Sequence, residues 1–348
     1  MTRRRHFPSI LLSISGDTPD RLRQAIGRSA RLHADAILIP TPWRELPSVA
    51  AVLGHPPMDR AELDACVGAA RRARLGVFLE VGLPSPGRGQ HTARYLSEFR
   101  ARHIHPLWEL DLAGVVIRSA GDWPADAILE FERFIRLTEG AVLFVDHGVG
   151  PDHELLDGQV DGVVDPVGVA GISRFLTGRC SGYDLEQFLV RQQHRLGINL
   201  AGRVLNPLER LDVPAKAAPI GIGLAYMLRG YPMVDDALAD DLERVYGPFG
   251  QLRRQLEVLE WGRFVPMTPA DRPEVLAFGR ADERVERPLL VIARREAGAA
   301  LSLPLAVGRF NPDKPFRSLM SEAEPVWVRE GWLDLPPSDG ANLLVLAQ

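Results

Sequence analysis

The sequence predicts a (β/α)8 TIM barrel followed by a small C-terminal antiparallel β-domain. Apolar, β-branched runs alternate with amphipathic stretches eight times over residues 1–260, as parallel strands alternate with helices in such barrels. Residues 261–348 instead hold short strand-like runs separated by Gly, Pro and Asp turns. A doubly wound sheet is the alternative, but no phosphate-binding glycine fingerprint supports it. The predicted domains are therefore 1–260, without a sizeable inserted domain, and 261–348.

Each predicted barrel strand is a short apolar run. The first, residues 7–14, contains Pro8 and leads directly into Gly16, which is typical of a strand and not of a secretion signal. No apolar run approaches the ~18 residues of a membrane helix, so we expect no membrane span. The other predicted barrel strands lie at residues 34–40, 76–82, 110–120, 141–147, 160–165, 197–205 and 231–234.

The helices are predicted from the amphipathic stretches between these strands. The first has Pro19 in its first turn, where proline is favoured, and Asp212 is predicted to cap a later, largely apolar helix. The predicted helices are 18–33, 59–74, 92–109, 124–139, 184–196, 212–228 and 239–260. In the C-terminal part, strands are predicted at 275–278, 288–292, 300–303 and 342–346.

The composition limits the classes of function. The chain has 348 residues, 46% hydrophobic and 25% charged, which is ordinary for a soluble globular protein. A formal net charge of −4 argues against general binding to nucleic acid or to an anionic membrane surface. The two cysteines, Cys66 and Cys180, are too few for a disulfide framework or a metal cluster, so we expect free thiols and a cytoplasmic location.

Motifs for a cofactor are missing from the sequence. Gly221 and Gly223 lie inside a helical stretch with no third glycine at the nucleotide-binding offset. The sequence also contains no phosphate loop, no Gly-x-Ser-x-Gly elbow and no Cys-x-x-Cys pair. We therefore expect no cofactor.

The predicted fourth strand, LDLAGVVIR, ends in an arginine, Arg118, and opens onto a polar loop. In an α/β barrel, chemistry takes place in the loops that follow the strands. Two interpretations of Arg118 are open: an ion pair with Glu80 or Asp146 on an adjoining strand, or a contact with a ligand or anion.

Several of these segments resemble the α-amylase family of glycoside hydrolases, and the likeness spans nearly the whole chain. Residues 34–42 (ADAILIPTP) resemble that family's second strand, and residues 59–83 resemble the helix and third strand that carry its first motif. Residues 108–120 (WELDLAGVVIRSA) resemble its fourth strand. Residues 216–234, ending RGYPMV, resemble the seventh helix and the entry to the eighth strand. Residues 262–264 and 275–280 resemble the opening of the C-terminal β-domain.

The catalytic positions implied by this resemblance are altered. The family's fourth strand reads Gly-Phe-Arg-hydrophobic-Asp and ends in the nucleophile, whereas GVVIR here puts Val116 at the arginine and Arg118 at the nucleophile. The acid glutamate of the fifth strand becomes Asp146, and Asn-His-Asp after the seventh strand becomes Asn206-Pro-Leu. The first motif begins at Glu80 and lacks its Asn-His. A guanidinium cannot form a glycosyl ester and opposes an oxocarbenium-like transition state.

The candidate site residues follow from these positions. If the chain is an enzyme, Glu80, Asp146 and Asp165 are its candidate catalytic carboxylates. Asp146, His147, Asp152 and His153 resemble an oxygen/nitrogen metal loop, but such residues are common in polar barrel loops, so we predict no metal. Ligand contacts are predicted for Arg118, Trp43, Trp123, His147, Arg203, Asn206, Tyr231 and Asp235. The aromatic rings among them would stack on sugar faces or pack the rim.

Together these features predict an α-amylase-like pseudoenzyme without the family's nucleophile. Its predicted role is to bind a carbohydrate or an anionic small molecule at the barrel mouth, or to act as a regulatory or assembly partner of another protein. The alternative is an active glycoside hydrolase or glycosyltransferase of carbohydrate metabolism that uses the relocated carboxylates Glu80, Asp146 and Asp165. Fold alone does not decide between them, and the sequence does not indicate an oligomeric state.

Overall fold

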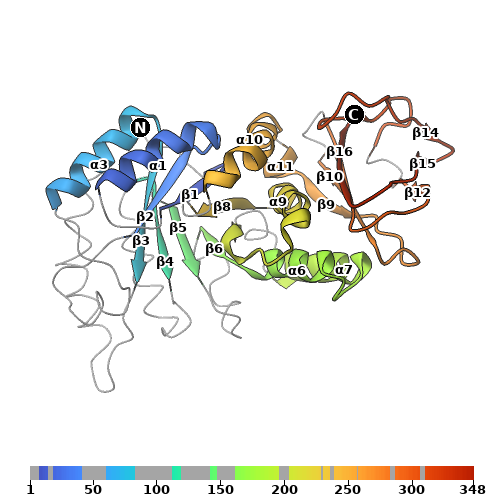
Figure 1. Ribbon diagram of the computed structural model, residues 1–348, viewed down its shortest axis with the longest axis horizontal. Helices are drawn as coiled ribbons and strands as arrows, with labels where there is room; N and C mark the ends of the chain where they lie inside the picture. Colours follow the sequence, from blue (N-terminus) through green and yellow to red (C-terminus); the bar gives the residue numbers. More distant parts are fainter. Residues whose placement is uncertain are drawn as a thin grey trace, which may run out of the picture. The chain divides into compact units, whose positions relative to one another are not determined.

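A computed structural model of the chain confirms the barrel and the C-terminal β-domain. It describes residues 8–14, 19–40, 60–82, 112–118, 142–146, 161–195, 204–228, 230–235, 239–256, 258–282, 287–305 and 310–348. The barrel strands pair in parallel in chain order, and β8 closes the barrel by pairing with β1 (Figure 1). These strands are β1 (Leu11–Ser13), β2 (Ala36–Pro40), β3 (Gly76–Gly82), β4 (Gly114–Arg118), β5 (Val142–Asp146), β6 (Gly162–Val164), β7 (Val204–Pro207) and β8 (Tyr231–Asp235).

A cluster of buried side chains fills the barrel interior. Because side chains alternate between the two faces of a strand, every second residue contributes to this cluster. The cluster consists of Leu11, Ala36, Leu38, Phe78, Val116, Val164, Leu205, Tyr231 and Met233. The residues between them, such as Leu12, Leu79 and Val115, are also buried, because both faces of a barrel sheet are covered.

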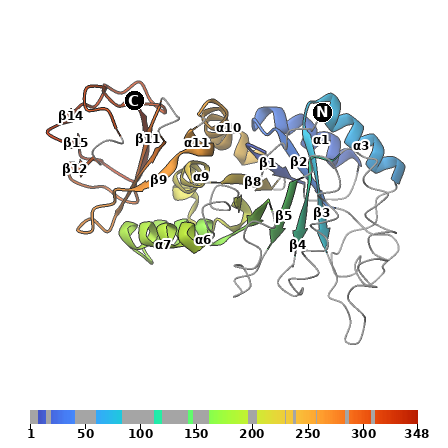
Figure 2. The ribbon, with the colours of Figure 1, turned by 180° about the vertical axis from the view of Figure 1, so that it is seen from behind.

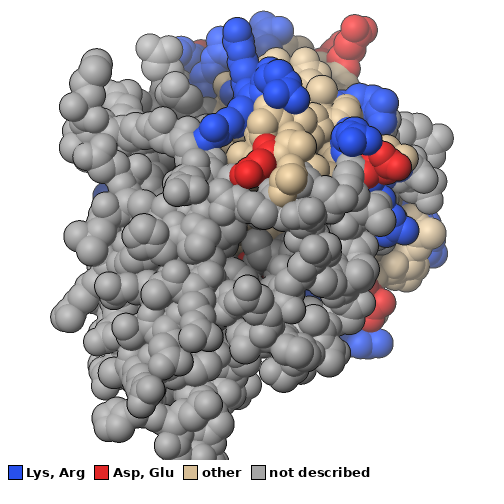
Figure 3. All heavy atoms as spheres, turned by 90° about the vertical axis from the view of Figure 1, so that its left-hand side faces the viewer, with Lys and Arg blue, Asp and Glu red and all other residues tan. Residues whose placement is uncertain are grey.

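The described helices are α1 (Pro19–Arg31), α3 (Arg60–Arg72), α6 (Val167–Leu176), α7 (Gly182–Arg195), α9 (Ala218–Met227), α10 (Ala239–Gln255) and α11 (Val258–Trp261). Basic and acidic side chains lie together on the face that Figure 3 shows. Arg71, Arg72 and Arg74, at the end of α3 and just after it, are exposed. None of the described helices is long and apolar enough to cross a membrane.

The C-terminal β-domain consists of two antiparallel sheets (Figure 2). The larger has the strand order β13-β16-β11-β10-β9 and the smaller has the order β12-β15-β14. Met267, Phe310, Phe316 and Leu333 belong to the buried cluster of this domain. The strands are β9 (Arg263–Pro266), β10 (Val275–Ala281), β11 (Leu289–Arg294), β12 (Leu301–Pro304), β13 (Arg317–Ser318), β14 (Val328–Arg329), β15 (Trp332–Leu335) and β16 (Asn342–Ala347).

The chain divides into two compact units. One comprises residues 1–165, 203–207 and 231–243 and contains all strands of the barrel. The other comprises residues 166–202, 208–230 and 244–348, and so joins helices α6, α7, α9 and α11 to the two antiparallel sheets. Within this second unit α7 contacts β10, and α9 contacts β11 and β16. A domain boundary at residue 260 stays a prediction.

The structure corrects three details of the predicted elements. Helix α6 was not predicted, and the predicted strand 197–205 is β7, whose bounds are Val204–Pro207. Asp212 does not cap a helix: α9 begins after Ala217, with a proline in its first turn, and a short 3-10 helix, Ala215–Ala217, precedes it. The Asp212 amide instead donates a hydrogen bond of 3.0 Å to the Ser173 hydroxyl of α6.

Candidate functional site

Several of the predicted site residues lie near the C-terminal ends of the barrel strands and share a phase, meaning that the two-residue alternation of a strand assigns them to the same face of the sheet. Phe78, Val116 and Met233 belong to the interior cluster, and Glu80, Arg118 and Asp235 each come two residues later on the same strands. Strand alternation therefore gives these three charged residues the phase of the barrel interior. Glu80 and Asp235 are half-buried.

Asp146, the last residue of β5, shares this phase. It pairs in register with Val164 of β6, which is a member of the interior cluster. Residues that pair on neighbouring strands lie on the same face of a sheet. Asp146 therefore belongs with Glu80, Arg118 and Asp235, and we call these four residues the mouth positions.

The register also places Arg118 beside Asp146. The last paired residues of β4 and β5 are Ile117 and Val145, and Arg118 and Asp146 each follow directly. On the other side of β4, Arg118 pairs with Gly82 and Val116 pairs with Glu80 of β3. Neighbouring strands lie about 4.8 Å apart, so the backbones of Arg118 and Asp146 are adjacent. The ion pair between them, or with Glu80, stays a prediction.

Two predicted site residues take the opposite phase. Asp165 follows Val164 directly and continues the ladder, because its amide donates a hydrogen bond of 3.0 Å to the Leu205 carbonyl of β7. Asn206 follows Leu205 directly, pairs with Pro232 and is buried. Since Val164 and Leu205 belong to the interior cluster, alternation directs Asp165 and Asn206 to the outer face of the sheet.

Tyr231 lies far from the mouth along its own strand. It is the first residue of β8, is buried and belongs to the interior cluster, whereas Asp235 is the last residue of that strand. Active sites of such barrels form at the C-terminal ends of the strands. Tyr231 therefore fills the barrel core, and its predicted ligand contact stays a prediction.

The other predicted contacts lie outside the described residues. These are Trp43, Trp123, His147 and Arg203, together with the Asp152 and His153 of the metal-loop interpretation. Among the described residues, no group of three or more His, Cys, Asp or Glu side chains has the arrangement of a metal site.

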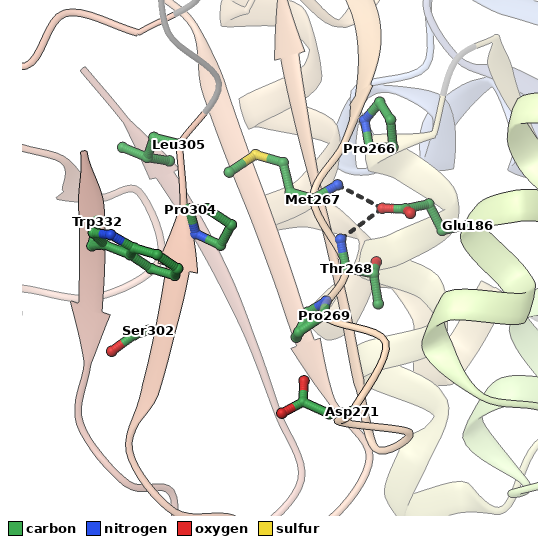
Figure 4. A pocket seen from close by; sticks show the side chains of 10 residues that line it. All are labelled: Glu186, Pro266, Met267, Thr268, Pro269, Asp271, Ser302, Pro304, Leu305 and Trp332. Carbon is green, nitrogen blue, oxygen red and sulfur yellow. Dashed lines mark hydrogen bonds between the residues drawn. The ribbon is translucent and has the colours of Figure 1, made fainter.

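A second candidate site, which sequence reasoning missed, is a cavity of about 550 Å³ between α7 and the β-domain, within the second unit (Figure 4). Trp332 and Pro304 line one side of this cavity, and residues 266–269 with Asp271 line another. The available signal was Gly331, because a glycine between two short strand-like runs, here residues 326–329 and 332–335, favours a hairpin.

The comparisons with known proteins support the fold. No model of a known protein family matches the sequence, and no curated protein matches it significantly. Among solved structures, a cyclomaltodextrinase is similar with a TM-score of 0.78 and 13% identity, over 97% of this chain and 77% of that chain. A maltogenic α-amylase from Thermotoga neapolitana has a TM-score of 0.75 and 13% identity, over 97% and 98% of the two chains.

An α-amylase from Geobacillus thermoleovorans, solved in complex with acarbose, is similar with a TM-score of 0.74 and 12% identity, over 97% and 98% of the chains. At this level of identity the likeness shows the fold. It confirms that the chain has the architecture of the α-amylase enzymes, as the sequence resemblance predicted.

Proposed function

We propose that this chain is an α-amylase-like pseudoenzyme that binds a carbohydrate at its barrel mouth without hydrolysing α-glucosidic bonds. The observation that carries the proposal is the phase of Arg118, which ends β4 two residues after the interior residue Val116. In the resemblance drawn from the sequence, this is the position of the catalytic nucleophile. A cation there cannot attack an anomeric carbon and opposes the positive charge that develops on the sugar ring.

The mouth positions provide groups that suit a polyhydroxyl ligand. Glu80, Asp146 and Asp235 can accept hydrogen bonds from sugar hydroxyls, and Arg118 can donate to ring or hydroxyl oxygens or to an anionic substituent. The Geobacillus enzyme was solved with acarbose. A further structure, which is similar to this chain with a TM-score of 0.71, was solved with maltose. These ligands support maltooligosaccharides as the first class to test.

The phase of Asp165 weakens the alternative proposal of an active glycoside hydrolase that uses the relocated carboxylates. A glycosidase needs two carboxyl groups about 5–5.5 Å apart, or about 6.5–9.5 Å apart, around the sugar. Alternation directs Asp165 to the outer face, so of the three relocated carboxylates Glu80 and Asp146 keep the phase of the barrel interior.

The test measures turnover and binding on the same preparation. The purified chain should release no product from starch, maltooligosaccharides or aryl α-glucosides, and should bind maltoheptaose in a calorimetric titration. Arg118→Ala should weaken binding by about tenfold, the loss of roughly one charge-assisted hydrogen bond. Arg72→Ala, which removes an exposed arginine at the end of α3, is the matched control and should bind as the wild type does.

Other outcomes have defined meanings. Turnover that disappears in Asp146→Asn would refute the pseudoenzyme and establish the alternative enzyme, whereas turnover that survives both Asp146→Asn and Arg118→Ala would come from a contaminant. Absence of any sugar binding would leave the regulatory or assembly role as the better proposal. We also propose a cytoplasmic location, because the sequence holds two cysteines, Cys66 and Cys180, too few for the disulfide framework of a small secreted domain.

A further inference from the structure

The second unit contains a cavity that the barrel mouth does not explain. It has a volume of about 550 Å³, within the range of small-molecule sites, and is lined by residues of α7, the segment after β9, β12 and β15. All of these elements belong to the same compact unit. Figure 4 shows Trp332 and Pro304 on the side of the smaller sheet, and Met267, Thr268 and Pro269 on the neighbouring segment.

Trp332 is held in place although its side chain is exposed. Trp332 is 47% exposed. It is the first residue of β15, where its backbone pairs with Pro304 of β12 and with Arg329 of β14. The hairpin between β14 and β15 turns on Glu330 and Gly331, with φ angles of 50° and 82°. Positive φ at both central residues is the type I′ geometry of a tight hairpin. The turn is anchored further because the Leu305 amide donates a hydrogen bond of 2.9 Å to the Gly331 carbonyl.

The opposite wall is fixed by the carboxylate of Glu186, which is 2% exposed. Its Oε2 accepts hydrogen bonds from the amides of Met267 (2.6 Å) and Thr268 (2.7 Å). The Thr268 hydroxyl donates a hydrogen bond of 3.0 Å to the Ala277 carbonyl of β10. Both walls are therefore held by hydrogen bonds before any ligand arrives, which reduces the entropy lost on binding.

The charges of the cavity disfavour an anionic ligand. Its charged lining residues are the carboxylates Glu186 and Asp271, and the lining that the structure describes includes no Lys, Arg or His. An anion would be repelled. A quaternary ammonium ion would be bound best by several aromatic faces, whereas Trp332 is the one aromatic residue among the described lining residues.

We propose that this cavity is a carbohydrate-binding site in which the indole of Trp332 stacks on the apolar face of a pyranose ring. Asp271, which is exposed, lies at the cavity and can accept hydrogen bonds from sugar hydroxyls, and the Ser302 hydroxyl, which donates to Asp334, can accept one as well. The prolines at 266, 269 and 304 add rigid apolar surface without losing side-chain freedom. The proposal rests on residues of the second unit alone and does not depend on the function proposed for the barrel mouth.

The experiment uses the full chain and maltoheptaose, with binding followed by calorimetry and by the intrinsic tryptophan fluorescence. Trp332→Ala should weaken binding at this site by about tenfold or more, and Trp332→Phe should retain most of it. Trp327→Ala is the matched control: Trp327 is 53% exposed and lies in the same hairpin, but it does not line the cavity, so this variant should bind as the wild type does. Both residues are exposed, so neither substitution should prevent folding.

The outcomes separate this site from the barrel mouth. A component of maltoheptaose binding that is lost in Trp332→Ala but retained in Arg118→Ala would support the β-domain site, whether or not the mouth contributes a second component. Binding that is unchanged in Trp332→Ala, or absent in the wild type, would overturn this proposal. Trp332-dependent binding of choline in place of maltoheptaose would overturn the carbohydrate assignment in favour of a cation site.

Discussion

The barrel mouth and the β-domain cavity are positioned by different kinds of interaction. At the mouth, Glu80, Arg118, Asp146 and Asp235 share a phase because the parallel ladder and the two-residue period of a strand set it. In the cavity, Glu186 reaches amides 81 and 82 positions away in the sequence. In one unit of the chain, the positions of the site residues are set by the regular alternation of side chains along neighbouring strands. In the other unit, they are set by individual hydrogen bonds between residues far apart in the sequence.

Stability measurements on matched core residues would sharpen this comparison. Phe78 belongs to the barrel cluster and Phe316 to the β-domain cluster, and both are fully buried. Phe78→Ala and Phe316→Ala should each lower the free energy of unfolding by about 3–5 kcal/mol, measured by urea denaturation followed by circular dichroism. Met320→Ala, at a position 39% exposed, should change it by less than about 0.5 kcal/mol. Equal effects of all three substitutions would mean that these clusters are not the cores of the two units.

Removal of the Glu186 carboxylate tests whether long-range hydrogen bonds hold the cavity wall. Glu186→Ala leaves the amides of Met267 and Thr268 without their acceptor and should lower the free energy of unfolding by about 2–4 kcal/mol. The variant should also weaken maltoheptaose binding at the Trp332 site. The control is Glu296→Ala, because the Glu296 side chain is 64% exposed and its ion pair with Arg295 spans 3.8 Å. Wild-type stability in Glu186→Ala would contradict the fixed wall.

The smallest expected effect concerns the start of α7, the helix that carries Glu186. The Asp184 amide donates to the Ser181 hydroxyl (3.0 Å), and the Ser181 hydroxyl and amide donate to the Asp184 carboxylate (2.7 and 3.2 Å). This reciprocal arrangement is a capping box. Ser181→Ala should lower the free energy of unfolding by about 1 kcal/mol at neutral pH.

The same pair predicts a pH dependence. The hydrogen bonds from the Ser181 side chain and backbone hold the pKa of Asp184 below its ordinary value of 3.8. A carboxylate with a depressed pKa stabilises the fold above the unfolded-state pKa, and this contribution is lost as pH falls through the folded-state pKa. The difference in Tm between wild type and Ser181→Ala should therefore shrink below about pH 4. Ser318→Ala, whose hydroxyl bonds to Ser321 and to backbone amides, should show no such trend.

Much of the fold could be predicted from the sequence because the barrel strands are continuous apolar runs. Residues 76–82 are predicted and observed with the same bounds as β3. Helix α6 was missed because its sequence, VGVAGISRFL, combines glycines and β-branched residues and is buried at Gly168, Ser173 and four apolar positions. Such a segment has neither the polar face nor the propensity of a typical surface helix.

The candidate site was predictable in part. The places of Glu80, Arg118, Asp146 and Asp235 at or near the ends of barrel strands could be predicted from the sequence, whereas their roles stay predictions. Asp165 and Asn206 were predicted by the same rule, but alternation assigns them to the outer face of the sheet. A difference of one residue along a strand exchanges the two faces, and the register of each strand is set by its pairing with the neighbouring strands. The cavity at Trp332 could not be predicted, since its walls come from segments that only the folded β-domain brings together.

The alternation along β4 has a consequence for how this protein can change over time. Replacing Arg118 alters the chemistry of the mouth while the interior cluster, which ends at Val116, keeps its residues. Inserting or deleting a single residue within β4 would instead exchange the two faces, bringing Val115 and Ile117 into the barrel and Arg118 out of phase. Substitutions at the strand ends are therefore the accessible mutational route by which this barrel could gain or lose an activity, whereas length changes within its strands would be selected against.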